Sequence, residues 1–182
     1  MNSRRQFISK GSLGILSALI LPSPAFSNEN PEFEGIVVNG DEGEAVRMRD
    51  GTAIVKIKIS KTQGAKSICF LSESFKPGDS LPVHKHLNED ELIFLLKGSG
   101  LFTLGNQQYP ISEGAVAMVP RGIWHGLQNT GDEDIEIRFA YTPSGFEGFF
   151  REVGTPVGQP FVKKSMEQRK AIAKKWGMIY KS

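Results

Sequence analysis

Residues 78–98 read GDSLPVHKHLNEDELIFLLKG, and residues 114–129 read GAVAMVPRGIWHGLQN. The chain has three histidines, and all of them lie in these two stretches. The spacings are Gly78-x5-His84-x-His86-x4-Glu91-x6-Gly98 and Gly114-x5-Pro120-x-Gly122-x2-His125-x3-Asn129. Three neutral imidazole nitrogens and one carboxylate oxygen suit a divalent transition metal. The two stretches therefore predict one metal site, with the ligands His84, His86, Glu91 and His125.

The local pattern explains how these four side chains can meet. His84 and His86 are two residues apart on a predicted strand, so both side chains leave the same face of a sheet. A polar turn over residues 88–90 follows, and Glu91 begins the next, strongly apolar strand. Its position on that strand makes Glu91 a better candidate than the two acids of the turn. His125 comes from a separate, much later strand, with Gly122 allowing a tight turn before it. The alternative is three unrelated structural histidines, which the shared pattern disfavours.

Short strands separated by glycine and proline turns dominate the chain up to residue 145. Polar and apolar residues alternate between residues 52 and 60, which is the period of a half-buried strand. Further strands are predicted over residues 67–75, 83–87, 91–97, 101–104, 107–111, 115–119, 124–128 and 135–141. Gly105-Asn106 suits a tight hairpin turn. The sequence predicts a closed or double-sheet all-β domain over residues 35–145.

The character of the chain changes in a C-terminal extension, residues 146–182. Ser165-x-x-Gln168 is a capping-box start for a helix over about residues 165–176. We expect its apolar face to dock on the domain. The residues of that face are Met166, Ile172, Ala173 and Trp176.

The first 27 residues have the pattern of a signal peptide. A basic start is followed by GSLGILSALIL over residues 11–21, which is too short for a stable membrane anchor. Ala25-Phe26-Ser27 offers a cleavage site near Ser27. The run Ser3-Arg4-Arg5-Gln6-Phe7 resembles a twin-arginine signal more than an ordinary secretory one. We therefore expect a periplasmic protein with a flexible segment at residues 28–34.

Charge and cysteine content exclude several classes of function. The formal charge is +2, but residues 1–27 contain three basic and no acidic side chains, so residues 28–182 are near neutral at −1. This balance gives no support for nucleic-acid binding, or for membrane binding after signal cleavage. Cys69 is the only cysteine, so no internal disulfide can form, and we expect it to be a small buried side chain.

Both stretches resemble the two defining motifs of the cupin superfamily. The resemblance implies a single-domain β-barrel or jelly roll, to which the C-terminal helix predicted above is added, and it implies that His84, His86, Glu91 and His125 bind one metal ion. Ala115 departs from the acidic residue of many cupins, at a position that is not a ligand. The run over residues 142–154 looks like the tail of small bacterial cupins loosely labelled quercetin-dioxygenase-like. Such labels narrow the family and leave the reaction open.

Four protein ligands on a six-coordinate ion leave two positions for an oxygen-chelating molecule. Fe(II) or Mn(II) suits this donor set best, and Ni(II), Zn(II) or copper could use the same atoms. The resemblance suggests that Glu91 leaves the metal and accepts a proton as a facultative base. Inward-facing apolar residues favour a partly apolar organic substrate. The predicted inward residues are Ile93, Leu95, Leu127, Phe70 and Phe139. Tyr141, Tyr109, Arg138 and Glu73 are candidates near the site, for which an ordinary structural role is preferred.

Three functions remain open from the sequence. The first is a metal-dependent, dioxygenase-like oxidoreductase acting on a small enol or phenol-like substrate. The second is a non-redox lyase or isomerase of sugar acids, and the third is a non-enzymatic metal or small-ligand binding protein. All three predict a small-molecule partner, and a homodimer is an open alternative to a monomer. No separate cofactor-binding residues are predicted beyond the metal ligands.

Overall fold

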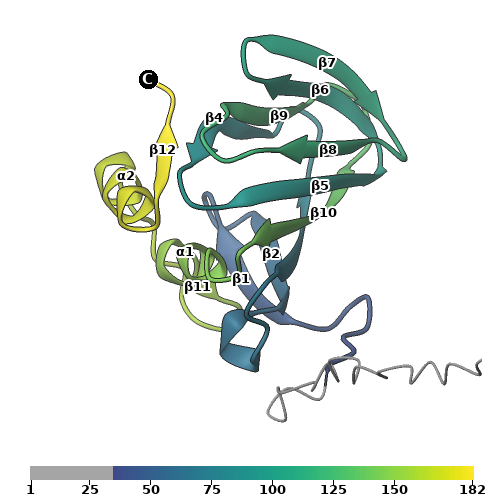
Figure 1. The fold of residues 1–182 in the computed structure, drawn as a ribbon. Helices are drawn as coiled ribbons and strands as arrows, with labels where there is room; N and C mark the ends of the chain where they lie inside the picture. The colour runs from purple at the N-terminus through teal and green to yellow at the C-terminus, as the bar shows by residue number, and fades with distance from the viewer. Residues whose placement is uncertain (1–34) are drawn as a thin grey trace, which may run out of the picture. The chain divides into compact units, whose positions relative to one another are not determined.

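The computed structural model describes residues 35–182, which form two antiparallel β-sheets around one hydrophobic core (Figure 1). The larger sheet has the strand order β11-β1-β2-β3-β10-β5-β8. Its strands are β1 (Glu44–Met48), β2 (Ala53–Ile59), β3 (Cys69–Phe75), β5 (Asp90–Lys97), β8 (Val116–Val119), β10 (Ile135–Thr142) and β11 (Thr155–Pro156). The smaller sheet has the order β12-β4-β9-β6-β7. Its strands are β4 (Ser80–His86), β6 (Ser99–Leu104), β7 (Gln107–Ser112), β9 (His125–Asn129) and β12 (Met178–Tyr180). The predicted all-β double-sheet class is confirmed.

The helical elements are few and short. They are η1 (Lys61–Gln63), α1 (Glu147–Val153) and α2 (Met166–Lys175). No helix within residues 35–182 has the length and apolar character needed to cross a membrane. The predictions made for residues 1–27 and 28–34 lie outside the described residues.

The strand period decides which side chains enter the core. In β5, Glu91, Ile93 and Leu95 are buried and their neighbours are less so, as the alternation predicts. Leu127 of β9 and Phe139 of β10 are buried as well. The interior is thus apolar along most of its length, with the carboxylate of Glu91 at one end of a buried row.

A β-bulge in β2 overturns part of the predicted alternation. The pairing of β2 with β3 shifts between Ile57 and Ile59, so the inward and outward sides change along β2. Lys58, predicted on the polar face, is only 5% exposed, and its Nζ donates hydrogen bonds to the carbonyls of Asn39 and Gly40. Phe70 of β3 is only partly buried, so its predicted place in the interior was wrong.

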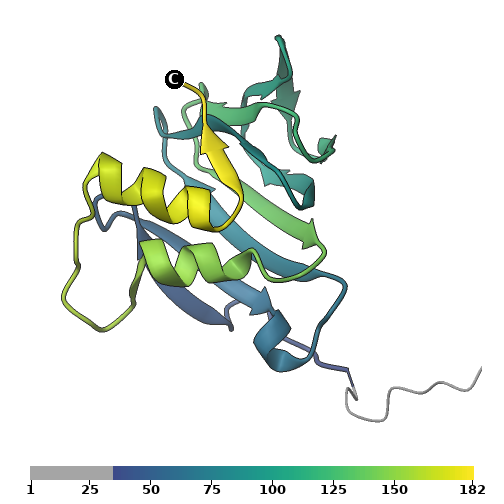
Figure 2. The ribbon, with the colours of Figure 1, turned by 60° about the vertical axis from the view of Figure 1, so that its left-hand side comes forward.

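The C-terminal extension adds a strand to each sheet and two helices beside them. Figure 2 shows α1 and α2 lying side by side, with β12 running from the end of α2 into the smaller sheet. The capping box predicted at Ser165 and Gln168 is present. Met166 was predicted to dock but is 57% exposed, whereas Ala173 is buried.

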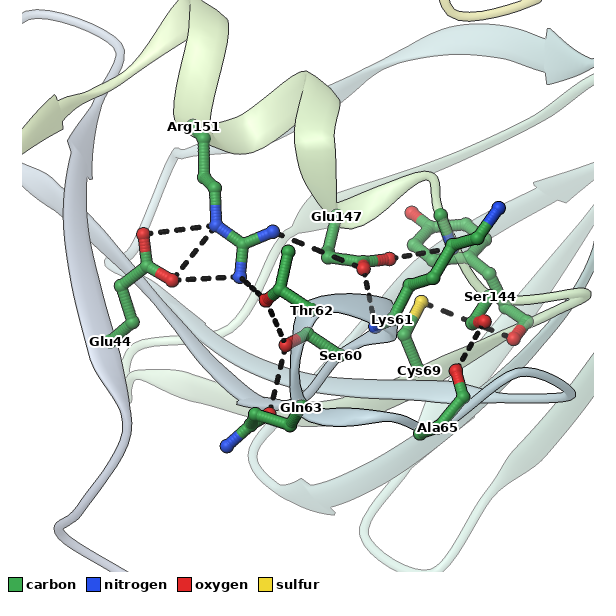
Figure 3. A network of polar contacts seen from close by, with 12 residues as sticks. Glu44, Ser60, Lys61, Thr62, Gln63, Ala65, Cys69, Ser144, Glu147 and Arg151 are labelled. Carbon is green, nitrogen blue, oxygen red and sulfur yellow. Dashed lines mark hydrogen bonds and ion pairs between the residues drawn. The ribbon is translucent and has the colours of Figure 1, made fainter. Parts of the chain in front are cut away.

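A buried carboxylate holds the start of α1 against the larger sheet (Figure 3). Glu147 accepts hydrogen bonds from the backbone N–H groups of Lys61 and Gly145, each at 2.7 Å. Arg151, one turn later, pairs with Glu44 of β1. These contacts fix the position of α1, whose phenylalanines line the cavity described below.

Candidate metal centre

The structure brings the four predicted ligands together between the two sheets. His84 and His86 come from β4, and His125 comes from the adjacent strand β9, where it lies opposite His84. Glu91 reaches them from β5 of the other sheet. One ligand atom from each residue lies within 4.8 Å of the others, and each residue is at most 3% exposed.

A register shift in β4 sets the histidine geometry. The register of the pairing between β4 and β9 shifts between Leu81 and His84, and Pro82 lies within this interval. Proline has no N–H for the ladder, which is why such an interruption is tolerated there. The Pro82 carbonyl then accepts a hydrogen bond from Nδ1 of His84 at 2.8 Å, and the Ile123 carbonyl accepts one from Nδ1 of His125 at 3.1 Å.

These backbone contacts determine the histidine tautomers. When Nδ1 carries the proton, Nε2 presents a lone pair, and metal-binding histidines are usually oriented in this way by a backbone carbonyl. The Nε2 atoms of His84 and His86 lie 3.1 Å apart. Because the Nδ1 atoms of His84 and His125 donate to backbone carbonyls, their Nε2 atoms are free to bind a metal ion.

The contact between His125 and Glu91 tests whether these residues fit a cation. His125 Nε2 lies 2.8 Å from Glu91 Oε2, yet neither atom makes a hydrogen bond among the described residues. Two buried acceptors at this distance repel each other, and a divalent ion between them would satisfy both. The donor set and its unsatisfied atoms therefore fit the predicted metal.

The protonation states also suit metal binding. Burial, reinforced by His125 and His86, lowers the pKa of His84 to about 3, which keeps its imidazole neutral. Glu91 lies among these imidazoles, and an ion bound there would favour its anionic form. Glu91 is therefore an anionic ligand candidate, and its role as a facultative base stays a prediction.

Aromatic side chains enclose the centre on one side. The His86 ring lies 4.3 Å from the Phe146 ring and 5.0 Å from the Tyr141 ring, measured between centroids. Burial and the nearby Glu91 carboxylate raise the pKa of Tyr141 well above its ordinary value. Its hydroxyl therefore remains protonated and can act only as a neutral donor or acceptor.

A cavity of about 260 Å³ opens beside the centre and includes His84 in its wall. Glu73 of β3 lines it from the larger sheet, and Phe149 and Phe150 of α1 form an apolar side. Arg169 of α2 and Tyr180 of β12 complete it. Tyr180 pairs with His84 across the β12–β4 ladder, so the C-terminal extension covers the strand that carries two of the candidate ligands.

The other candidates from the sequence divide into two pairs. Tyr141 and Glu73 point inward and are buried. Tyr109 is 44% exposed on β7, and Arg138 donates to the carbonyl of its neighbour Ile137 on a partly exposed position, so neither reaches the centre. Arg49, Arg169 and Tyr180 also line the cavity, and no pattern in the sequence predicted them there. Of the residues in this wall, the sequence had indicated Glu73 as a candidate near the site and His84 as a ligand.

Comparison with known proteins agrees with the geometry. A model of the cupin domain matches residues 71–141. The oxalate-binding protein of Thermotoga maritima is 32% identical over 111 residues, which cover 58% of this chain and 92% of that protein. The chain belongs to the cupin superfamily. An acireductone dioxygenase of Stenotrophomonas maltophilia is 40% identical to this cupin over 87 residues, but these cover only 45% of that enzyme.

A solved structure extends the similarity to the whole barrel. The crystal structure of a predicted oxalate decarboxylase from Thermotoga maritima superposes on this cupin with a TM-score of 0.54 at 27% identity. The superposed residues cover 59% of this chain and 99% of the chain in that crystal structure.

Proposed function

We propose that this cupin is a metal-dependent, dioxygenase-like enzyme that acts on a small organic molecule with two chelating oxygen atoms. One observation carries the proposal: a buried cluster of three imidazoles and one carboxylate has one member, His84, in the wall of a small cavity. A structural metal site is usually closed, whereas a catalytic one has access for a substrate. The cavity supplies that access at His84.

Fe(II) and Mn(II) are the ions that we favour for His84, His86, Glu91 and His125, with Ni(II) or Zn(II) as alternatives. A divalent ion in this place would supply Lewis acidity, orient the chelating oxygens and, with iron, activate dioxygen. The surrounding residues supply the rest. The rings of Phe146, Phe149 and Phe150 exclude water, and the protonated Tyr141 hydroxyl is a neutral hydrogen-bonding group near Glu91.

The relatives support the chelating substrate class. The names of two of them refer to oxalate and one names an acireductone dioxygenase. Oxalate is a dicarboxylate that binds metals through two oxygens. A cavity of about 260 Å³ is near the small end of the range for ligand pockets, which favours a compact molecule.

A non-enzymatic role is the second candidate. One relative, 92% of whose length is covered, is named for oxalate binding, without a reaction. A binding protein would hold the metal and the chelating anion and release the anion unchanged.

Oxygen consumption separates the two candidates. The protein is loaded with Fe(II) under nitrogen, and oxygen uptake is followed after addition of catechol, an enediol or oxalate, with the Zn(II) form as a control. Uptake that requires both Fe(II) and an enol or catechol supports the enzyme. Calorimetric binding of oxalate without turnover of any substrate supports the binding protein and contradicts the enzyme.

We further propose that the protein is exported to the periplasm by a twin-arginine signal and cleaved near Ser27. The support is the sequence of residues 1–27 alone. Mass spectrometry of the protein recovered from the periplasm should give the mass of a chain that begins at residue 28. Replacement of Arg4 and Arg5 together by lysine should leave the uncleaved chain in the cytoplasm, and unchanged export would exclude the twin-arginine route.

A further inference from the structure

Glu73 is a buried carboxyl group that the proposed metal site does not use. It lies on the inward face of β3, in the row that also contains Cys69, Leu71 and Phe75. An acidic residue in such a row is rare because burying a charge without full compensation is unfavourable. A buried acidic residue in this position therefore indicates a specific role for its carboxyl group.

Arg49 compensates only one of the two oxygens of Glu73. Its Nη2 donates to Glu73 Oε1 at 2.8 Å, and its Nη1 donates to Asp79 at 3.1 Å. The guanidinium also lies over the Phe75 ring, 4.4 Å from the centroid. Arg49 is thus held on three sides, and it orients the carboxyl group of Glu73. Among the described residues Oε2 of Glu73 has no hydrogen-bond partner.

Glu73 and one of the four candidate ligands, His84, line the same cavity. Glu73 comes from the larger sheet and His84 from the smaller one, and both line the same space of about 260 Å³. A ligand that fills it touches both residues. The wall also contains the apolar side chains of Met48, Phe149 and Phe150, together with the charged Arg49 and Arg169.

We propose that Glu73 is the acid–base residue of this cavity, whose Oε2 exchanges a proton with an enol or phenol hydroxyl of the substrate while Arg49 holds Oε1. In the forward direction the substrate O–H bond breaks, its electron pair stays on the substrate oxygen, and an O–H bond forms at Oε2. The reverse transfer returns the proton to substrate or product. This inference rests on the proposed function, because it assumes that the cavity holds the substrate.

The electrostatic surroundings support this role. Burial raises the pKa of Glu73 to about 7, with Arg49 opposing the shift and Asp79 and Glu91 adding to it. The titratable and charged groups around Glu73 are Arg49, Asp79, Glu91, Tyr141, His84, Arg169 and Tyr180. A carboxyl group that titrates near neutrality is suited to take and return a proton.

Proton counting during ligand binding tests the proposal without turnover. The probe is 4-nitrocatechol, and the protein is loaded with Zn(II), which cannot oxidise it. Calorimetry in two buffers of different ionisation enthalpy gives the protons released to solvent at about pH 6 and about pH 8. At the higher pH, Glu73 is ionised and should take up a proton from the probe, so Glu73→Gln should release about one proton more than the wild type. At the lower pH the two proteins should agree.

Glu136→Gln is the matched control, because Glu136 is a partly exposed residue of β10 that does not line this cavity. It should behave as the wild type at both pH values. If Glu73→Gln does not fold, the infrared difference spectrum of wild type with and without the probe replaces it, and a newly protonated carboxyl group is expected at the higher pH. Equal proton counts in wild type and Glu73→Gln, or the absence of that infrared band, would overturn the role of Glu73.

The metal content of the same samples keeps the two proposals apart. Binding of the probe to the Zn(II) form with no contribution from Glu73 contradicts only the acid–base role. Stoichiometric zinc without binding of the probe contradicts the hydroxyl substrate class and, with it, the role of Glu73. A wild type that retains no zinc contradicts the proposed function itself.

Discussion

The burial of Glu73 predicts a pH-dependent gain in stability when it is replaced by glutamine. Its pKa is about 7 in the folded protein, against an ordinary value of 4.5. Below about pH 4.5 the carboxyl group of Glu73 is neutral in the folded and in the unfolded protein. The stabilising contribution of the neutral group to the free energy of unfolding is therefore fully present at such pH values. As the pH rises through about 7, the buried carboxyl group ionises and that contribution is lost. The difference between the two pKa values corresponds to about 3 kcal/mol.

Glu73→Gln removes the ionisation and keeps an oxygen that can accept from Arg49. Relative to wild type, the free energy of unfolding of this variant should therefore rise by about 3 kcal/mol between about pH 4.5 and about pH 8. The assay is urea unfolding of both proteins at a series of pH values with a chelator present, so that metal binding does not contribute. Glu136→Gln serves as the control, since Glu136 is a more exposed residue of the same sheet. A difference between wild type and Glu73→Gln that does not change with pH would refute the reasoning.

Three further predictions concern the packing around the site. Gly148→Ala should destabilise the protein by about 1–3 kcal/mol in urea unfolding, because the added methyl group would overlap the Trp176 ring and push α2 away from α1. Gly100→Ala should have an effect of about the same size, since its methyl group would meet the Gln128 carbonyl in β9, and an unchanged unfolding midpoint would contradict the observed strand contact. Burial raises the pKa of Cys69 to about 12, so its thiol should react with a disulfide reagent only after unfolding, and fast labelling of the native protein would contradict its position in the core.

The sequence predicted that these four side chains would meet because the strand positions that orient them are set by short local patterns. Two histidines at a spacing of two must share a face wherever the strand is regular, and Glu91 takes its direction from the row that it forms with Ile93 and Leu95. The glycine-framed motifs then supplied the expectation that two distant stretches meet. The structure brings His125 opposite His84 as that expectation requires.

The failures occur where the strand period is interrupted or where distant segments meet. A bulge in β2 changed the direction of Lys58, and no local pattern marks that bulge. The cavity wall combines Arg49, which follows β1, with Arg169 and Tyr180 from the C-terminal extension. These residues are distant in sequence and follow no common period, so only the fold brings them together.

The metal content of the purified protein tests the central claim most directly. Wild type and the double variant His84→Ala with His86→Ala are reconstituted with Fe(II) or Mn(II), desalted and measured by elemental analysis. Glu89→Gln, in the turn beside the site, is the matched control. We expect about one ion per chain in wild type and in the control, and almost none in the double variant, with an unchanged far-ultraviolet circular dichroism spectrum. Equal metal content in wild type and the double variant would contradict this expectation.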